Sequence, residues 1–256
     1  MPFIEPKLEI AKGNYTNHSH IYQIGFNSNV AGDFETLWTL GGTYPTDQIA
    51  TANALHISSS ANEDTVEGVG ARTITIEGLD ANYNVVTETL SMQGKIAVSS
   101  SNSFIAINKA FIATGGAAEQ SGSIRINASG SATNIVVGII DSNHKQLTQA
   151  HYTIPAGHKA YLQNVNCGVG NNISSSFALY QKPSGSVYRS VTFDTTFGDP
   201  TSTNVNSAIE FDEKTELDLR AKGDVSNGLA SGQFSLILVS SSNIPVEPAR
   251  IEGFIL

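Results

Sequence analysis

Short runs in which apolar and polar residues alternate recur along this chain, and this pattern predicts β-strands. Residues 73–76 and 85–90 alternate on either side of the turn-forming sequence Gly78-Leu79-Asp80, which predicts a β-hairpin. Apolar residues at the helical spacing of three and four positions are nearly absent. The chain is therefore expected to be all-β.

Further strands are predicted wherever the alternation returns. Residues 135–140 and 146–152 flank a turn and predict a second hairpin. The other expected strands are residues 122–126, 177–180, 187–193, 216–221 and 233–239. Turn-rich stretches separate the strands about every 8–12 residues, a spacing typical of β-sandwiches and barrels.

A weak internal repeat predicts how these strands are grouped. A strand, a glycine-rich turn and a second strand follow one another in residues 104–126 and again in residues 161–180. The repeat predicts two β-sandwich units, residues 21–130 and residues 131–242. One continuous large sandwich is the alternative.

Both ends of the chain differ from its middle. Residues 1–20 contain two prolines and show no alternation, and residues 243–256 close on Phe254, Ile255 and Leu256. The sequence therefore predicts an N-terminal and a C-terminal arm. Apolar side chains at a chain end are usually tied down, so these three residues are candidate inter-subunit contacts. They dock either on their own domain or on a neighbouring subunit.

Composition excludes several classes of protein. Charged residues make up only 14% of the 256 residues, against roughly 25% in typical soluble domains. A hydrophobic content of 40% can build a core, which excludes a disordered chain. Acidic residues outnumber basic ones by 23 to 14, which excludes a basic nucleic-acid binder. Cys167 is the single cysteine, which excludes a disulfide-stapled module.

The sequence shows no targeting or membrane signal. A basic segment followed by an apolar core is not found after Met1, so no signal peptide is expected. No run of 18 apolar residues occurs, so no membrane span or membrane partner is expected. The chain is expected to be made in a cytoplasm.

Two sets of side chains have the residue types of a metal site. His18 and His20 would share one face of a strand, and His56 or a carboxylate could supply a third ligand, but polar surface histidines are the favoured interpretation. Asp80 and the two asparagines that follow at alternate positions resemble the start of a calcium loop. A hairpin turn explains that stretch better, because Asx side chains bond their own backbone.

Other candidate sites also have simpler structural interpretations. Cys167 with His158 and His151 could form a nucleophile and its base, but a buried, inert thiol is favoured. Trp38 and Tyr44 could form a sugar platform, but core positions are favoured. The paired glycines do not open helices and predict turns rather than phosphate-binding loops.

Five carboxylates gather within nine positions and could perform glycoside hydrolysis. These residues are Glu210, Asp212, Glu213, Glu216 and Asp218. The alternation around them favours the solvated face of a strand, where the charges would protect a sheet edge. No catalytic residue, metal ligand or cofactor is therefore predicted.

The chain resembles a known group of proteins. Residues 54–94 read as a strand, a Gly-Leu-Asp turn, a second strand with Thr87-Glu88-Thr89, and a glycine. This segment resembles one found in structural proteins of tailed bacteriophages, especially marine ones. Residues 210–239 are similar to the C-terminal part of the same group, and residues 154–161 also fit it. The resemblance implies a jelly-roll-like β-sandwich and no enzymatic activity, and it carries over no functional residues.

The function predicted from the sequence is therefore that of a virion structural protein. A capsid decoration or cement protein is expected, located on the capsid surface, trimeric, and bound to the major capsid protein or other virion proteins. A tail-associated structural or receptor-binding protein is the first alternative. A carbohydrate-binding β-sandwich outside a virion is the second.

Overall fold

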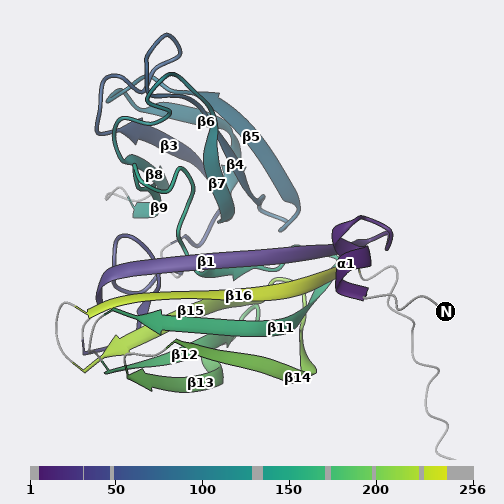
Figure 1. Ribbon diagram of the computed structural model, residues 1–256. Helices are drawn as coiled ribbons and strands as arrows, with labels where there is room; N and C mark the ends of the chain where they lie inside the picture. Colours follow the sequence, from purple (N-terminus) through teal and green to yellow (C-terminus); the bar gives the residue numbers. More distant parts are fainter. Residues whose placement is uncertain are drawn as a thin grey trace, which may run out of the picture.

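The computed structural model describes residues 6–30, 32–46, 49–128, 135–170, 174–197, 200–224 and 228–240. Within these residues almost all regular structure is β-strand in antiparallel sheets, which confirms the all-β prediction (Figure 1). The helix α1, Pro6–Ala11, lies in the predicted N-terminal arm, where no helix was expected. No helix of the described chain is long and apolar enough to cross a membrane.

The first of two sandwiches is built from both ends of the described chain. One sheet has the strand order β1-β16-β11-β14, and the other has the order β10-β15-β12-β13, with β2 also paired to β15. The strands are β1 His18–Val30, β2 Glu35–Thr36, β10 His151–Thr153, β11 His158–Val169, β12 Ser174–Lys182, β13 Arg189–Phe197, β14 Thr201–Phe211, β15 Glu216–Gly223 and β16 Gly228–Ser240.

This strand order is that of a jelly roll. β2 and β10 can be counted together as the second strand, which leaves eight strands numbered 1 to 8 in chain order. Their spatial order is 1-8-3-6 in one sheet and 2-7-4-5 in the other. Eight strands wound in this way form the double Greek key of a jelly roll. The jelly-roll-like sandwich expected from the sequence is therefore confirmed, with its second strand in two pieces.

The two pieces of the second strand join on Leu219 of β15. In an unbroken antiparallel pair, two opposite residues exchange both backbone hydrogen bonds. Leu219 instead makes one of these two bonds with Leu37 and the other with Ala150. Its oxygen accepts from the Leu37 nitrogen and its nitrogen donates to the Ala150 oxygen, each at 2.9 Å. The Ala150 nitrogen donates to the Leu37 oxygen at 2.9 Å and closes the break. The chain between Leu37 and Ala150 is thus inserted within one strand.

The inserted chain forms the second sandwich, which stands beside β1 in Figure 1. Its sheets have the orders β6-β3-β8-β9 and β5-β4-β7. The strands are β3 Asn53–Ser59, β4 Ala71–Leu79, β5 Val85–Ser91, β6 Val98–Phe104, β7 Ala106–Gly115, β8 Ile124–Ala128 and β9 Ile135–Ile140. Two separate clusters of buried apolar side chains confirm two sandwiches rather than one continuous large one.

Alternation along the strands explains each core. In β15, Leu217, Leu219 and Ala221 face inward, and Phe234 and Leu236 of β16 meet them from the opposite sheet. All five side chains are fully buried or nearly so. Burying a Leu or Phe side chain contributes about 1.5–3 kcal/mol, so the folded state depends mainly on these inward positions.

A buried carboxylate fixes the loops at one end of the inserted sandwich. Asp64 has no solvent exposure, and its two oxygens accept from the backbone nitrogens of Ala71, Ser121 and Gly122 at 2.6–2.9 Å. Hydrogen bonds to a charged acceptor are stronger than neutral ones and offset the cost of its burial. Asp64 therefore holds together segments that are far apart in the sequence.

The predicted unit boundaries need correction. Units of residues 21–130 and 131–242 would follow one another along the chain, but β1 pairs with β16 over most of its length. The two sandwiches are nested, because the chain leaves the jelly roll after Leu37 and returns at Ala150. Strands that follow one another in the sequence usually lie next to each other in a sheet, and this tendency favoured two units in succession along the chain.

One of the two predicted hairpins is confirmed. β4 and β5 pair across the expected turn, in which the Asp80 Oδ1 accepts from the backbone nitrogens of Asn82 and Asn84. The hairpin predicted from residues 135–140 and 146–152 is wrong, because β9 pairs with β8 and β10 pairs with β15. The intervening turn exists, but it carries the chain from one sandwich to the other.

The arm predictions are only partly testable. The predicted N-terminal arm, residues 1–20, includes α1 and the first three residues of β1. The C-terminal arm, residues 243–256, lies outside the described residues, together with Phe254, Ile255 and Leu256.

We predict that Gly25→Ala strongly destabilises the protein. Gly25 lies in β1 directly over the break in the second strand, where an added Cβ would meet the Leu37 oxygen at 2.2 Å and the Ala150 Cβ at 2.5 Å. Overpacking of this kind typically costs about 1–3 kcal/mol. Urea denaturation should show a free energy of unfolding lower by about 2 kcal/mol or more.

Gly32→Ala is the matched control, because a Cβ there has no atom within 4 Å. Its free energy of unfolding should change by less than about 0.5 kcal/mol. Equal effects of the two substitutions would contradict the close approach of β1 to the broken strand.

Candidate functional site

The first candidate site is a cluster of charged side chains on the outer face of β15. Asp218 is fully buried, and its Oδ2 accepts from the Arg220 Nε at 2.7 Å and from the Thr36 Oγ1 at 3.0 Å. The Thr36 hydroxyl in turn accepts from the backbone nitrogen of Tyr44 at 2.9 Å. Strand pairing positions Arg220, since it lies opposite Thr36 of β2.

A second carboxylate lies two residues earlier on the same face. The Glu216 Oε2 accepts from the Tyr188 hydroxyl at 2.8 Å, and the Lys182 Nζ lies 3.6 Å from its Oε1. His151 of β10 places its Nε2 3.9 Å from the Glu216 Oε2. Burial raises the pKa of Glu216, but His151, the Tyr188 hydroxyl and Lys182 outweigh it and bring that pKa down to about 2.

Aromatic rings cover this charged cluster. Tyr44 stacks on the His151 ring at a centroid distance of 4.2 Å and meets Trp38 edge to face at 5.2 Å. The Arg220 guanidinium lies 4.8 Å from the Tyr180 ring centroid and 4.3 Å from that of Tyr188, close enough for cation–π attraction. The sheet face that would otherwise be solvated is therefore closed.

The cover also joins the two sandwiches. The Tyr44 hydroxyl donates to the backbone oxygen of Val137 in β9 at 3.0 Å, and burial raises the pKa of that hydroxyl. Asn108 of β7 makes a second link, since its amide donates to the Thr153 oxygen at 2.8 Å and accepts from the Thr153 nitrogen at 2.9 Å. The junction is thus held by buried hydrogen bonds to the backbone.

The space inside this cluster is small. The cavity that His151 and Glu216 line has a volume of about 30 Å³, which is the size of one or two water molecules. Asp218 Oδ1 and both ring nitrogens of His151 have no hydrogen-bond partner among the described residues. The cavity therefore leaves little room beside these groups.

The carboxylate prediction is therefore partly wrong. Glu210 and Asp212 are exposed beside Lys159, as expected of a solvated face. Glu216 and Asp218 instead lie beneath aromatic side chains on a central strand, so they protect no sheet edge. The cover comes from distant segments, including Tyr44 and Tyr188, which the local alternation could not reveal.

The structure does not bring the candidate metal ligands together. His18 and His20 lie at the start of β1, whereas His56 lies in the inserted sandwich, 2.9 Å from the Ser99 hydroxyl. Across the described part of the chain, no three His, Cys, Asp or Glu side chains form a group that could hold a metal ion.

The remaining sequence candidates occupy structural positions. Cys167 is buried, and burial, with a smaller effect of Asp194, raises the pKa of its thiol to about 12, which favours an unreactive thiol. His158 lies at the opposite end of the same strand, roughly 30 Å away. Trp38 and Tyr44 are both 3% exposed, which confirms core positions and excludes a sugar platform.

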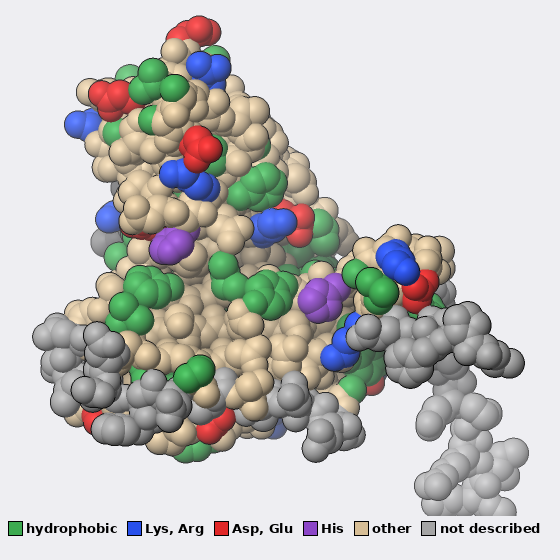
Figure 2. Space-filling model, viewed as in Figure 1, with side chains coloured by type: hydrophobic (Ala, Val, Ile, Leu, Met, Phe, Trp, Pro, Cys, Tyr) green, Lys and Arg blue, Asp and Glu red, His purple; other side chains and the backbone are tan. Residues whose placement is uncertain are grey.

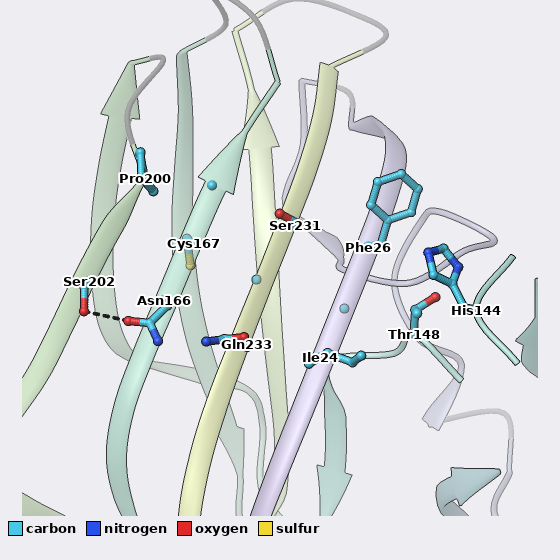
Figure 3. A pocket seen from close by; sticks show the side chains of 13 residues that line it. Ile24, Phe26, His144, Thr148, Asn166, Cys167, Pro200, Ser202, Ser231 and Gln233 are labelled. Carbon is cyan, nitrogen blue, oxygen red and sulfur yellow. Dashed lines mark hydrogen bonds between the residues drawn. The ribbon is translucent and has the colours of Figure 1, made fainter. Parts of the chain in front are cut away.

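The second candidate site is a hollow on the outer face of the sheet β1-β16-β11-β14, with a volume of about 580 Å³ (Figure 3). Strand register defines its floor. Ser202, Asn166, Gln233 and Ile24 form one row across the four strands. Gly168, Ser231 and Phe26 form the next outward-facing row.

Small residues produce the hollow. Gly168 and Ser231 are the shortest members of the floor, and they lie between the taller side chains of Pro200 and Phe26 (Figure 3). A Cβ on Gly168 would point into the hollow, since its nearest neighbours would be the Ser231 hydroxyl at 3.8 Å and Pro200 at 4.0 Å. On the opposite face of the sheet, the paired Gly25 and Gly232 allow close approach to the broken strand.

Hydroxyl and amide groups make up most of the polar lining of this hollow, and His144 is the one histidine among its described lining residues. The Ser202 hydroxyl donates to the Asn166 Oδ1 at 2.6 Å, and the Tyr22 hydroxyl donates to the Gln233 Oε1. The described residues that line the hollow include no Asp, Glu, Lys or Arg. Sequence reasoning missed this site, because its floor comes from four strands separated along the chain.

We predict that Glu216→Gln removes a specific part of the acid sensitivity of the fold. The ordinary pKa of 4.5 falls to about 2 in the folded protein, so the charged carboxylate stabilises the fold above pH 4.5. That contribution should be lost as the pH falls from about 4.5 to 2, and it amounts to roughly 3 kcal/mol at most. Chemical denaturation of the variant at a series of pH values should show a flatter profile in this window.

Glu210→Gln is the control for this experiment. The Glu210 carboxylate is exposed in its ion pair with Lys159, and exposed pairs contribute little. A Glu216→Gln profile parallel to that of the unsubstituted protein would contradict the assigned environment of Glu216.

Comparison with known proteins leaves the chain without a family. No protein family matches it, and no curated protein matches it in sequence. Similar solved structures include the VP2 subviral particle of infectious bursal disease virus, with 10% identity over 94% of this chain and 79% of that chain and a TM-score of 0.25. T=1 particles derived from the same virus give 12% identity, coverage of 89% and 71%, and a TM-score of 0.24. Scores this low carry no information on function.

Proposed function

We propose that this chain is a non-enzymatic structural protein of a virion, and specifically a capsid decoration protein that binds the major capsid protein. The jelly-roll strand order carries the proposal, since eight-stranded jelly rolls are a recurrent fold of viral capsid domains. The resemblance of residues 54–94 and 210–239 to phage structural proteins agrees with it.

The rigid junction between the sandwiches supports a structural role. The inserted sandwich is attached by the two crossings at Leu37 and Ala150, by the Asn108–Thr153 pair, and by the Tyr44 bond to β9. Buried and satisfied contacts of this kind resist relative motion of two domains. A protein built in this way can present its second sandwich at a fixed angle to the surface that binds its first.

The surface composition suits a particle exposed to variable salt. Figure 2 shows charged side chains scattered over a surface made mostly of other polar groups and backbone. Only 14% of the residues are charged. Ion pairs on a surface weaken as salt screens them, whereas neutral hydroxyl and amide groups are much less affected.

The proposal includes no catalytic activity. Its support is that the buried Asp218 and the half-buried Glu216 are engaged by hydrogen bonds beneath an aromatic cover, beside a cavity of only about 30 Å³. Their role is to stabilise the junction.

The mode of attachment is also part of the proposal. A decoration protein stabilises a shell by adding buried area where capsomers meet, and a trimer matches a three-fold position of such a shell. The apolar end of the chain, Phe254, Ile255 and Leu256, would add to that buried area in contact with a neighbouring subunit or a capsid protein.

We predict that purified virions contain this chain at a fixed ratio to the major capsid protein. Quantitative mass spectrometry should find on the order of hundreds of copies per particle, as expected if every equivalent capsomer junction is occupied. About a dozen copies or fewer would contradict decoration and indicate the tail instead. Absence of the chain from purified particles would overturn the virion role altogether.

A further inference from the structure

We propose that the hollow on the sheet β1-β16-β11-β14 is a binding site for a neutral glycan. The hollow is the one bounded by Pro200 on one side and by Phe26 on the other in Figure 3. This inference does not rest on the virion role, because it follows from the chemistry of the lining residues alone.

The size and shape of the hollow fit a small ligand. Its volume of about 580 Å³ lies within the range of roughly 300–1,000 Å³ found for ligand sites. The low floor of Gly168 and Ser231 continues into the row of Asn166 and Gln233, so the hollow runs along the strands as well as across them. A short chain of sugar rings can lie in such an open trough.

The floor offers neutral hydrogen-bonding groups to a ligand. The oxygens of the Asn166 and Gln233 amides are already bonded, whereas their nitrogens have no partner among the described residues. Figure 3 shows these two amides side by side on adjacent strands, with the Ser231 hydroxyl above Gln233. Amide nitrogens and hydroxyls together can satisfy both the donor and the acceptor of a sugar hydroxyl.

The walls offer apolar surface for the faces of sugar rings. The Phe26 ring lies 6.0 Å from the His144 ring, and Ile24 adds an aliphatic side chain on the same side. The face of a sugar ring carries C–H groups that pack on rings and aliphatic side chains, while its rim carries hydroxyls. Pro200 lines the opposite wall.

Other classes of ligand fit this site less well. A phosphate or an acidic ligand is held best by Lys or Arg, and neither is present among the described lining residues. The imidazole of His144, which lines the hollow, already lies 3.9 Å from the Asp141 carboxylate. A peptide that adds a strand needs a free sheet edge, but β11 and β16 are both paired on each side. A purely apolar ligand would leave the two amides desolvated without partners, which is unfavourable.

The experiment uses the full-length protein on an array of neutral oligosaccharides, including glucans, mannans, galactans and chitin fragments. The strongest ligand on the array is then titrated in solution by calorimetry. Gly168→Trp should weaken binding more than tenfold, because the added ring fills the hollow without a clash at its Cβ. Asn166→Ala and Gln233→Ala should each weaken binding about tenfold through the loss of an amide.

Thr195→Trp is the matched control. It places the same side chain at an exposed position of β13, in the opposite sheet, and should leave the dissociation constant unchanged. Thermal melts of all four variants identify any that fail to fold, and the two alanine variants keep the test valid if Gly168→Trp does not.

Two results would overturn the proposal. One is the absence of saturable binding to any neutral oligosaccharide on the array. The other is binding that Gly168→Trp, Asn166→Ala and Gln233→Ala all leave unchanged, since the glycan would then occupy a different surface.

Discussion

The fold depends on the hydrogen bonds that rejoin one interrupted strand. Leu219 pairs with the nitrogen of Leu37 and the oxygen of Ala150 as if these belonged to a single residue. The inserted sandwich can therefore leave and re-enter the jelly roll without opening the sheet β10-β15-β12-β13. An unpaired backbone group buried at this point would cost as much as a lost hydrogen bond, so the closure of the break is required for both sandwiches.

Two other features are connected to the same constraint. The chain leaves the strand beside β1, and Gly25 with its partner Gly232 allows the backbone and side chain of Leu37 to approach. The outer face of the same sheet segment carries the hollow, whose floor includes Gly168 and Ser231. On the other side of the jelly roll, the returning strand places His151 next to Glu216, and the departing chain brings Tyr44 over it. Tyr44 thus helps to shield from solvent the polar sheet face on which His151 and Glu216 lie.

The sequence could predict local structure well and long-range order poorly. Alternation placed β4, β12, β15 and β16 correctly, because each of these strands turns a buried face to a core. It also placed β5, whose inward positions are only partly buried. The nesting of the sandwiches could not be predicted, since the pairing of β1 with β16 leaves no signal in either strand alone.

At the candidate sites too, local environments could be predicted from the sequence, whereas contacts between distant segments could not. The core position of Trp38 was predicted from the alternating stretch around it, and the buried, inert thiol of Cys167 from a strand-to-turn stretch without a catalytic signature. The burial of Asp218 was not predicted, because its cover consists of segments that the chain brings in from elsewhere. The hollow depends on the register across four strands, and no single residue of its floor indicates a site in the sequence.

Amide hydrogen exchange at the break tests the central claim most directly. If the interrupted strand is a true member of the sheet, the amides of Leu37, Ala150 and Leu219 should exchange as slowly as those of Leu162 and Leu236 in the core strands, through global unfolding alone. Fast exchange of these three amides by local opening, with β11 and β16 still protected, would contradict the claim that the break is closed.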